Sequence, residues 1–228
     1  MEQVSEAARE LAQRMTTVHI SRIDEMPRIE LYLDQVLSLV SDELAFMALP
    51  GEDLITGSMV NNYVKQRLVP APVHRRYTRR HVATLLFVCA FKRVFSISEV
   101  KALYEACVER SIDVASTYDD LVAAVERALA ARFAELAGES AGAPERDVAS
   151  GAPLASVAAT PLAPAATALA SAAPTPVAPA ATALASTGVT LRDADGNAVA
   201  PDLDRIMSAG VGAVADKVFV EQMLALRR

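Results

Sequence analysis

The sequence predicts an all-α protein: a helical bundle, then an Ala/Pro-rich disordered linker and a short C-terminal element. Two observations support this. Apolar residues recur at helical spacing through most of residues 1–137, and capping residues, Pro and Gly mark the ends of the periodic segments. From 138 to 188 the composition changes to Ala, Pro, Ser and Thr, which cannot supply a packed interior. The core must therefore come from the first half, although 52% of all residues are hydrophobic.

The first two predicted helices precede residue 50. An amphipathic helix covers roughly residues 2–15, and an irregular link leads from it to Pro27. A longer helix follows, and Pro50 and Gly51 end it. Its apolar stripe consists of Ile29, Leu33, Val36, Leu37, Val40, Leu44 and Met47.

Four more helices are predicted in the first half. Thr56 and Thr78 can serve as N-caps of the first two, while Ser96–Glu99 and Thr117–Asp120 have the spacing of capping boxes in the last two. These side chains would satisfy the free amides of each first turn. The predicted helices span 57–67, 79–94, 97–109 and 118–136.

The last of these helices has an apolar stripe that allows two interpretations. The stripe could form a homodimer, or it could pack within the chain, because Arg132 interrupts a strict heptad pattern. Its residues are Leu121, Val125, Leu129 and Leu136.

The linker contains the string APAATALAS twice, starting at Ala163 and at Ala178, which is typical of a flexible, partly polyproline segment. Beyond it, Asp195-Gly196-Asn197 predicts a hairpin turn, and residues 211–226 predict a final helix. The predicted organisation is an N-terminal helix and link (1–22), a helical domain (23–137), a linker (138–188) and a C-terminal hairpin and helix (189–228).

The sequence favours a cytoplasmic protein without membrane association. Glu2, Glu6 and Glu10 stand where a secretory signal would be basic and then apolar. The longest apolar stretch, 82–91, is about half of what a membrane-spanning helix needs, and fits a buried core helix. Cys89 and Cys107 have no CxxC spacing, as expected for reduced thiols.

Charge is segregated along the chain. The net charge is −6, yet no acidic residue lies between Asp53 and Glu99. A basic segment attracts polyanions, and the acidic remainder of the chain limits indiscriminate binding. The cations of this segment are Lys65, Arg67, Arg75, Arg76, Arg79, Arg80, Lys92 and Arg93.

Helix 57–67 has one polar face without a carboxylate. Asn and Gln side chains suit adenine edges, and Lys suits guanine acceptors or phosphates, so this face predicts DNA base contacts. The opposite face holds Met59, Val60, Tyr63 and Val64. The predicted base-contacting residues are Ser58, Asn61, Asn62, Lys65 and Gln66. A helix docking an acidic protein partner would show the same face.

Residues 70–77 predict a basic loop that grips phosphates. Pro70 and Pro72 stop the preceding helix and stiffen an extended connection. Arg79 and Arg80 stand at a helix start, where the dipole disfavours cations, so a function for them is expected. The predicted phosphate-contacting residues are Thr56, His74, Arg75, Arg76, Arg79 and Arg80.

The run ITGSMVNNYVKQRLVPAPVHRRYTRRHVATLLFV, with FSISEVKALYEA after it, resembles the MerR-type winged helix-turn-helix. Segments MPRIELYLDQVL (26–37) and SMVNNYVK (58–65) are more similar to the bacterial domain-of-unknown-function family number eighteen-thirty-six. The resemblance covers roughly 23–109. The MerR likeness implies a recognition helix at 57–67, a wing at 70–77 and a role in transcription. Two departures are Arg67, where MerR proteins have a helix-closing glycine, and the long connection 49–55.

No motif indicates catalysis. There is no glycine-rich phosphate loop, GxSxG or HExxH, and His74, His81 and Cys89 lack zinc-site spacing. In DADGN the glycine comes fourth, not sixth as in a calcium loop. We therefore expect no enzyme, cofactor or metal, and no effector ligand is indicated. The sequence predicts a sequence-specific DNA-binding transcriptional regulator with double-stranded DNA as partner; the alternative is a helical protein interaction module.

Overall fold

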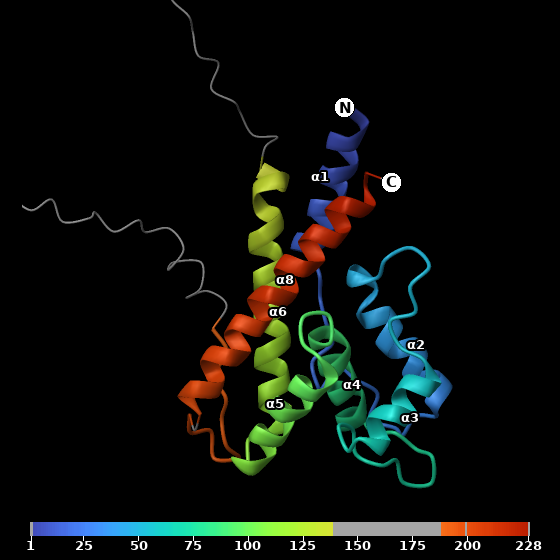
Figure 1. Ribbon diagram of the computed structural model, residues 1–228, viewed down its shortest axis with the longest axis vertical. Helices are drawn as coiled ribbons and strands as arrows, with labels where there is room; N and C mark the ends of the chain where they lie inside the picture. Colours follow the sequence, from blue (N-terminus) through green and yellow to red (C-terminus); the bar gives the residue numbers. More distant parts are fainter. Residues whose placement is uncertain (1, 139–187, 199, 228) are drawn as a thin grey trace, which may run out of the picture.

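The computed structural model describes residues 2–138, 188–198 and 200–227, and their regular structure is helical (Figure 1). The predicted all-α class is confirmed, since the described residues add only isolated β-bridges to the helices. Of the predicted linker, residues 139–187 lie outside the described residues. In chain order the helices are α1 (Glu2–Thr16), α2 (Leu33–Glu43), the 3₁₀ turn η1 (Ala45–Met47), α3 (Gly57–Lys65), α4 (Arg79–Phe91), α5 (Ile97–Glu109), α6 (Val114–Gly138) and α8 (Pro201–Ala225).

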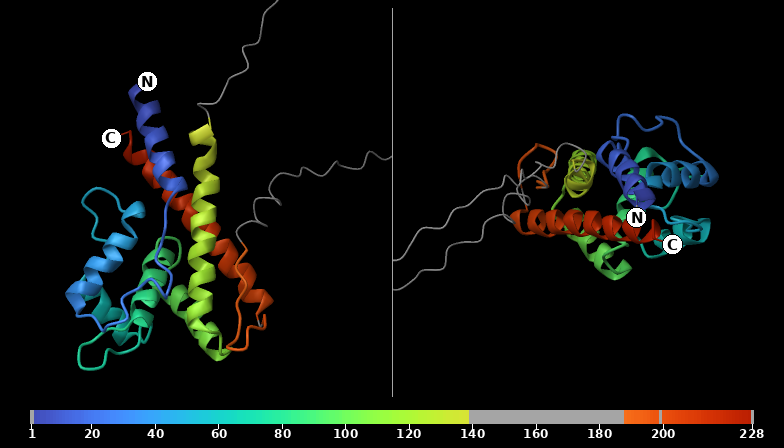
Figure 2. Two further views of the ribbon diagram at one scale, coloured as in Figure 1. Left: turned by 180° about the vertical axis from the view of Figure 1, so that it is seen from behind. Right: turned by 90° about the horizontal axis from the view of Figure 1, so that it is seen from above.

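Helices α1, α6 and α8 form a long bundle, and the shorter helices α2 to α5 lie beside one end of it (Figure 2). The two parts share one core, in which α4 contacts α2, α6 and α8. Ten of the thirteen residues of α4 are buried, so the prediction of a buried core helix at 82–91 is confirmed. None of the helices in the described ranges is both long and apolar enough to cross a membrane.

The link between α1 and α2 is irregular, as predicted, and carboxylates hold it in place. The backbone N–H of Ile20 donates to Glu126 Oε1 at 2.7 Å, and that of Ile23 donates to Asp119 Oδ1 at 2.9 Å. Arg22 pairs with Glu126, and Ser21 N–H donates to Glu43 Oε2 at 2.8 Å. Side chains of α6 and α2 thus satisfy backbone groups that no regular element pairs.

Helix α2 begins at Leu33, so the predicted start at Ile29 is wrong. Leu31 is extended and exchanges two backbone hydrogen bonds with Tyr77, at 2.8 and 2.9 Å. Tyr32 is the N-cap, and its N–H donates to the side chain of Gln35. Ile29, placed on the apolar stripe by periodicity, is 71% exposed. A backbone pairing with a residue 46 positions away overrides the local helical pattern.

Helix α6 begins at Val114, four residues before the predicted start. Asp113 precedes it and accepts from the backbone N–H and the hydroxyl of Ser116, so the predicted capping box at Thr117–Asp120 is wrong. The apolar stripe of α6 packs within the chain: Leu121, Val125 and Leu129 are buried, and α1 and α8 both lie against this helix.

Helix α8 begins at Pro201, ten residues before its predicted start. Pro at the first position and two acidic residues in the first turn are ordinary start signals. The predicted turn at 195–197 is present, with Gly196 at φ 84° and its N–H bonded to Asp193 O.

Gly210 lies where α8 crosses the end of α4. A Cβ there would stand 2.8 Å from Phe91 Cε1 and 3.0 Å from Phe95 Cε2, whereas a Cβ on Gly212 would meet nothing within 4 Å. We expect Gly210→Ala to lower the free energy of unfolding by about 1 kcal/mol or more, because overpacking outweighs the gain in helix propensity. Gly212→Ala should raise it by about 0.5–1 kcal/mol. Urea unfolding of both variants checks the pair, and equal effects would contradict the close approach.

Candidate nucleic-acid interface

Helix α3 presents the predicted base-contacting face to solvent. Val60 and Tyr63 are buried in the core, and burial raises the pKa of Tyr63 to about 12. Thr56 is the N-cap, as predicted, and its hydroxyl oxygen accepts from the N–H of Met59 at 3.3 Å. The hydroxyl that was predicted to contact a phosphate therefore already has a partner in the helix. Gln66 is half-buried; the remaining residues of the predicted face, Ser58, Asn61, Asn62 and Lys65, are exposed.

Arg67 closes α3 in the backbone conformation that usually belongs to glycine. Its φ is 60°, its N–H donates to Val64 O at 3.0 Å, and the N–H of Leu68 donates to Tyr63 O at 2.9 Å. These two bonds form a Schellman motif, in which the left-handed residue is commonly glycine. The departure at Arg67 therefore concerns its side chain, while the backbone turn that closes the helix is in place.

Arg67→Gly is expected to raise the free energy of unfolding by about 1 kcal/mol, because a non-glycine residue pays roughly that cost in the left-handed region. Lys65→Gly, two residues earlier in ordinary helical geometry, is the matched control and should lower it by about 1 kcal/mol. Thermal or urea unfolding measures both. A loss of stability in Arg67→Gly would show that the arginine side chain has a structural role.

Residues 73–76 form a tight turn whose tip is basic. Val73 and Arg76 form an antiparallel bridge, and Arg76 N–H donates to Val73 O at 2.8 Å. Between them His74 and Arg75 have φ of 51° and 62°. Positive φ at both central residues is typical of a type I′ hairpin turn, where Asn-Gly is preferred. We call residues 70–77 the hairpin segment; His74 and Arg75 are exposed at its tip.

Tyr32 is a candidate interface residue that the sequence pattern assigned to a helix. The guanidinium of Arg76 lies 3.7 Å from the centroid of its ring, and Tyr32 stays 50% exposed. Stacking and the Leu31–Tyr77 backbone bonds together hold the hairpin segment against the start of α2. Arg76, predicted to contact phosphate, is half-buried and already has an aromatic partner.

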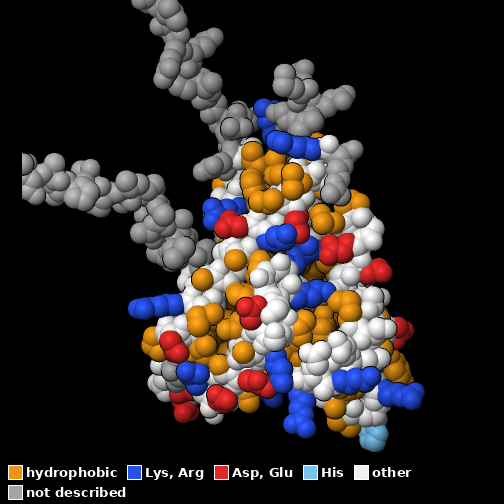
Figure 3. All heavy atoms as spheres, viewed as in Figure 1, with side chains coloured by type: hydrophobic (Ala, Val, Ile, Leu, Met, Phe, Trp, Pro, Cys, Tyr) orange, Lys and Arg blue, Asp and Glu red, His pale blue; other side chains and the backbone are white. Residues whose placement is uncertain are grey.

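The remaining cations of the basic segment do not lie on the surface formed by α3 and the hairpin segment. Arg79 Nη1 lies 3.4 Å from Ile23 O and from Asp24 Oδ1, whereas Arg80 is exposed on the first turn of α4. Lys92 donates to Leu54 O at 2.7 Å, and Arg93 is buried in ion pairs, so these two have structural roles. The basic face therefore reduces to Lys65, Arg67, His74, Arg75 and Arg76. In Figure 3 cationic side chains and a histidine lie at the lower right of the molecule, around α3, whereas acidic side chains lie at its lower left.

His81 anchors the base of the hairpin segment. Its Nδ1 accepts the N–H of Thr78, the N-cap of α4, at 3.0 Å, and its ring meets Tyr77 edge-on at 5.6 Å. Burial lowers the pKa of His81, which favours the neutral ring that this acceptor role needs. Burial also raises the pKa of the Cys89 thiol to about 11, as expected of an inert core cysteine. Within the described ranges, no group of three or more His, Cys, Asp or Glu residues could hold a metal ion.

Residues 21–121 match the family model described as a domain of unknown function, DUF1836. No curated protein and no solved structure matches the chain. The matched segment contains α2 to α5 and the hairpin segment, and it includes both sequence strings that carried the family resemblance. The match supports the resemblance to that family over residues 21–121.

Proposed function

We propose that this protein is a sequence-specific DNA-binding transcriptional regulator, with α3 as recognition helix and the hairpin segment as wing. The observation that carries the proposal is that the polar face of α3 and the basic tip of the hairpin segment follow each other directly in the chain. An exposed polar helix face without any carboxylate lies directly before a turn with a basic tip. Such a pair can place amides at base edges and cations at phosphates.

Backbone strain at the cationic positions supports the same function. Of the four non-glycine residues with positive φ among those described, Arg67, His74 and Arg75 lie in this unit. Each costs about 1–2 kcal/mol relative to glycine, which would form the same turns without strain. Strained backbone conformations of this kind cluster at functional sites, and here the strained positions carry basic side chains.

The size of α3 suits the major groove. An α-helix with its side chains is about 10–12 Å across, close to the groove width of about 12 Å, and the nine residues of α3 extend about 13.5 Å along their axis. Because the apolar face of α3 packs into the core, its polar face is the one that can reach the bases. The predicted cytoplasmic location would give such a protein direct access to bacterial DNA, its proposed partner.

A genomic fragment selection with the full chain tests the proposal. We expect a recurring duplex to be enriched and bound at least about 1,000-fold more tightly than a scrambled duplex. Asn61→Ala with Asn62→Ala should lower the affinity for the selected duplex by about ten-fold or more, and leave that for the scrambled duplex unchanged. Failure to enrich any sequence, with no duplex binding at low salt, would contradict the proposal.

An interaction module remains the second candidate, because apolar side chains are exposed in the hairpin segment and just before α2. Ile29 is 71%, Val73 66% and Tyr32 50% exposed. Exposed apolar residues next to cations also suit an acidic protein partner. Recovery of one stoichiometric acidic protein, insensitive to nuclease and lost in Ile29→Ser with Val73→Ser, would favour this function over DNA binding.

A further inference from the structure

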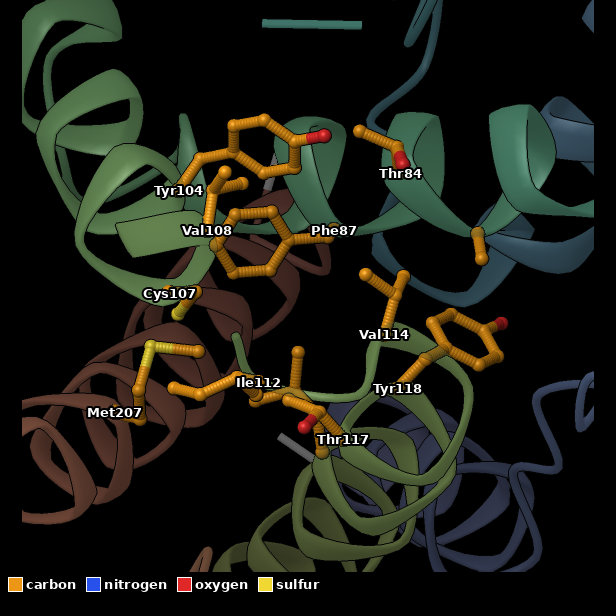
Figure 4. A pocket seen from close by; sticks show the side chains of 12 residues that line it. Thr84, Phe87, Tyr104, Cys107, Val108, Ile112, Val114, Thr117, Tyr118 and Met207 are labelled. Carbon is orange, nitrogen blue, oxygen red and sulfur yellow. The ribbon is translucent and has the colours of Figure 1, made fainter. Parts of the chain in front are cut away.

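Helix α8 lies on the outside of the bundle. In Figure 1 it crosses in front of α6, and in the view from behind α6 lies in front of it (Figure 2). Its inner side packs on the core, where Met207 lines a cavity among α4, α5, α6 and α8 (Figure 4). Its outer side carries three of the seven large apolar side chains that are exposed among the described residues: Ile206 at 44%, Val220 at 51% and Leu224 at 54%.

The outer side of α8 has a seven-residue repeat. Positions spaced alternately by four and three residues form one stripe along a helix, and this spacing is typical of helices that pair as coiled coils. None of the positions in the stripe is buried. Arg227 directly follows Leu226, the C-cap of α8, whose backbone angles are still helical. The stripe consists of Asp202, Ile206, Ala209, Ala213, Asp216, Val220, Met223 and Arg227.

The charges of this stripe are complementary to a reversed copy of itself. In an antiparallel pair of α8 helices with Ile206 opposite Met223, apolar side chains meet along most of the contact. In the same register Asp202 of each copy lies opposite Arg227 of the other, so both ends of the contact join opposite charges. In a parallel pair Asp202, Asp216 and Arg227 would each face a like charge, which disfavours association.

Two carboxylates of the stripe already have partners in their own chain. Asp216 pairs with Arg132 of α6, which neutralises its charge in the middle of the contact, where it would lie opposite Ala213. Asp202 Oδ2 lies 3.2 Å from Arg110 Nη2, but the side chain stays 65% exposed. A carboxylate can accept from several donors, so Asp202 can also bind a cation of a second copy.

We propose that two copies of this chain associate through the outer side of α8, antiparallel and related by a two-fold axis. A two-fold axis makes each contact occur twice, so one self-complementary stripe is sufficient. A Cβ on Gly212, beside the middle of the stripe, would meet nothing within 4 Å, which leaves room for close approach of a second helix. The apolar stripe of α6, in contrast, packs within the chain.

Sedimentation equilibrium of the full chain without DNA measures this association. One helix pair is a small interface, so we expect a dissociation constant of about 1–100 µM and a mass that rises with concentration to that of two chains. Val220→Ser should weaken association by about ten-fold or more, because each dimer loses two apolar side chains from the contact. Val73→Ser makes the same change at a valine that is 66% exposed in the hairpin segment, and should leave association unchanged.

Reversal of the end charges tests the antiparallel register. Asp202→Arg alone and Arg227→Asp alone each set like charges opposite one another twice per dimer, and each should weaken association by about ten-fold. The double variant restores opposite charges and should associate more tightly than either single variant. A parent chain that stays monomeric up to about 1 mM would overturn the proposal. Equal effects of Val220→Ser and Val73→Ser, or a double variant no tighter than the single ones, would overturn it as well.

Discussion

Replacing Arg93 with methionine is expected to lower the free energy of unfolding by about 3–5 kcal/mol. The Arg93 side chain is 7% exposed and lies between three partners: Glu221 Oε2 at 2.6 Å, Glu52 Oε2 at 2.6 Å and Met47 O at 2.7 Å. It joins the end of α4 to α8 and to the turn before α3. Methionine fills the space but leaves Glu221, which is 17% exposed, with Lys217 as its one ion partner among the described residues.

Arg132→Met is the matched control. Arg132 also joins two elements, pairing with Asp216 between α6 and α8, but both side chains are about half exposed. An exposed ion pair contributes about 0–1 kcal/mol, so this variant should remain close to the parent protein. Urea unfolding of the full chain measures both variants. Equal losses in the two would show that burial of the Arg93 network has little energetic consequence.

The second large effect concerns DNA affinity and its dependence on salt. Each cation that neutralises a phosphate adds about 0.9 to the slope of log affinity against log salt concentration. Arg75→Ala should lower that slope by about 0.9, and Arg75→Ala with Arg76→Ala by about 1.8 if both arginines contact phosphate. If Arg76 acts only by stacking on Tyr32, the second substitution will change affinity without changing the slope further.

Arg205→Ala serves as the charge-matched control for this series. Arg205 is exposed on the first turns of α8, away from α3 and the hairpin segment, and its loss changes the net charge by the same amount. Its salt slope should equal that of the parent protein. A slope that falls equally in Arg205→Ala and Arg75→Ala would indicate a diffuse charge effect and no defined wing.

Local signals in the sequence were sufficient for three of the described α-helices. The periodic runs and caps predicted α1, α3 and α5 within two residues at each end, and they predicted that Val60 and Tyr63 face the core. These features depend on residues within one or two turns of each other, and such spacing is visible in the sequence. The exposed polar face of α3 follows from the same periodicity.

Features set by distant contacts could not be predicted. Leu31 leaves the helical pattern because Tyr77 pairs with its backbone, and Arg93 leaves the basic surface because Glu221 binds it from α8. The left-handed conformations of Arg67 and Arg75 are also unexpected, because arginine does not favour positive φ, whereas histidine, as at position 74, is among the residue types enriched there. Charge counting in the sequence treated all cations as equivalent, whereas the fold separates surface cations from structural ones.

Amide chemical shifts of the isotope-labelled full chain, recorded during titration with the selected duplex, test the proposed interface most directly. We expect the largest changes to be confined to α3 and the hairpin segment, centred on Asn61, Asn62 and Arg75, with α1 and the length of α8 unaffected. Changes centred on α8 or α6, or no change at saturating duplex, would contradict the assignment of this face as the DNA-binding surface.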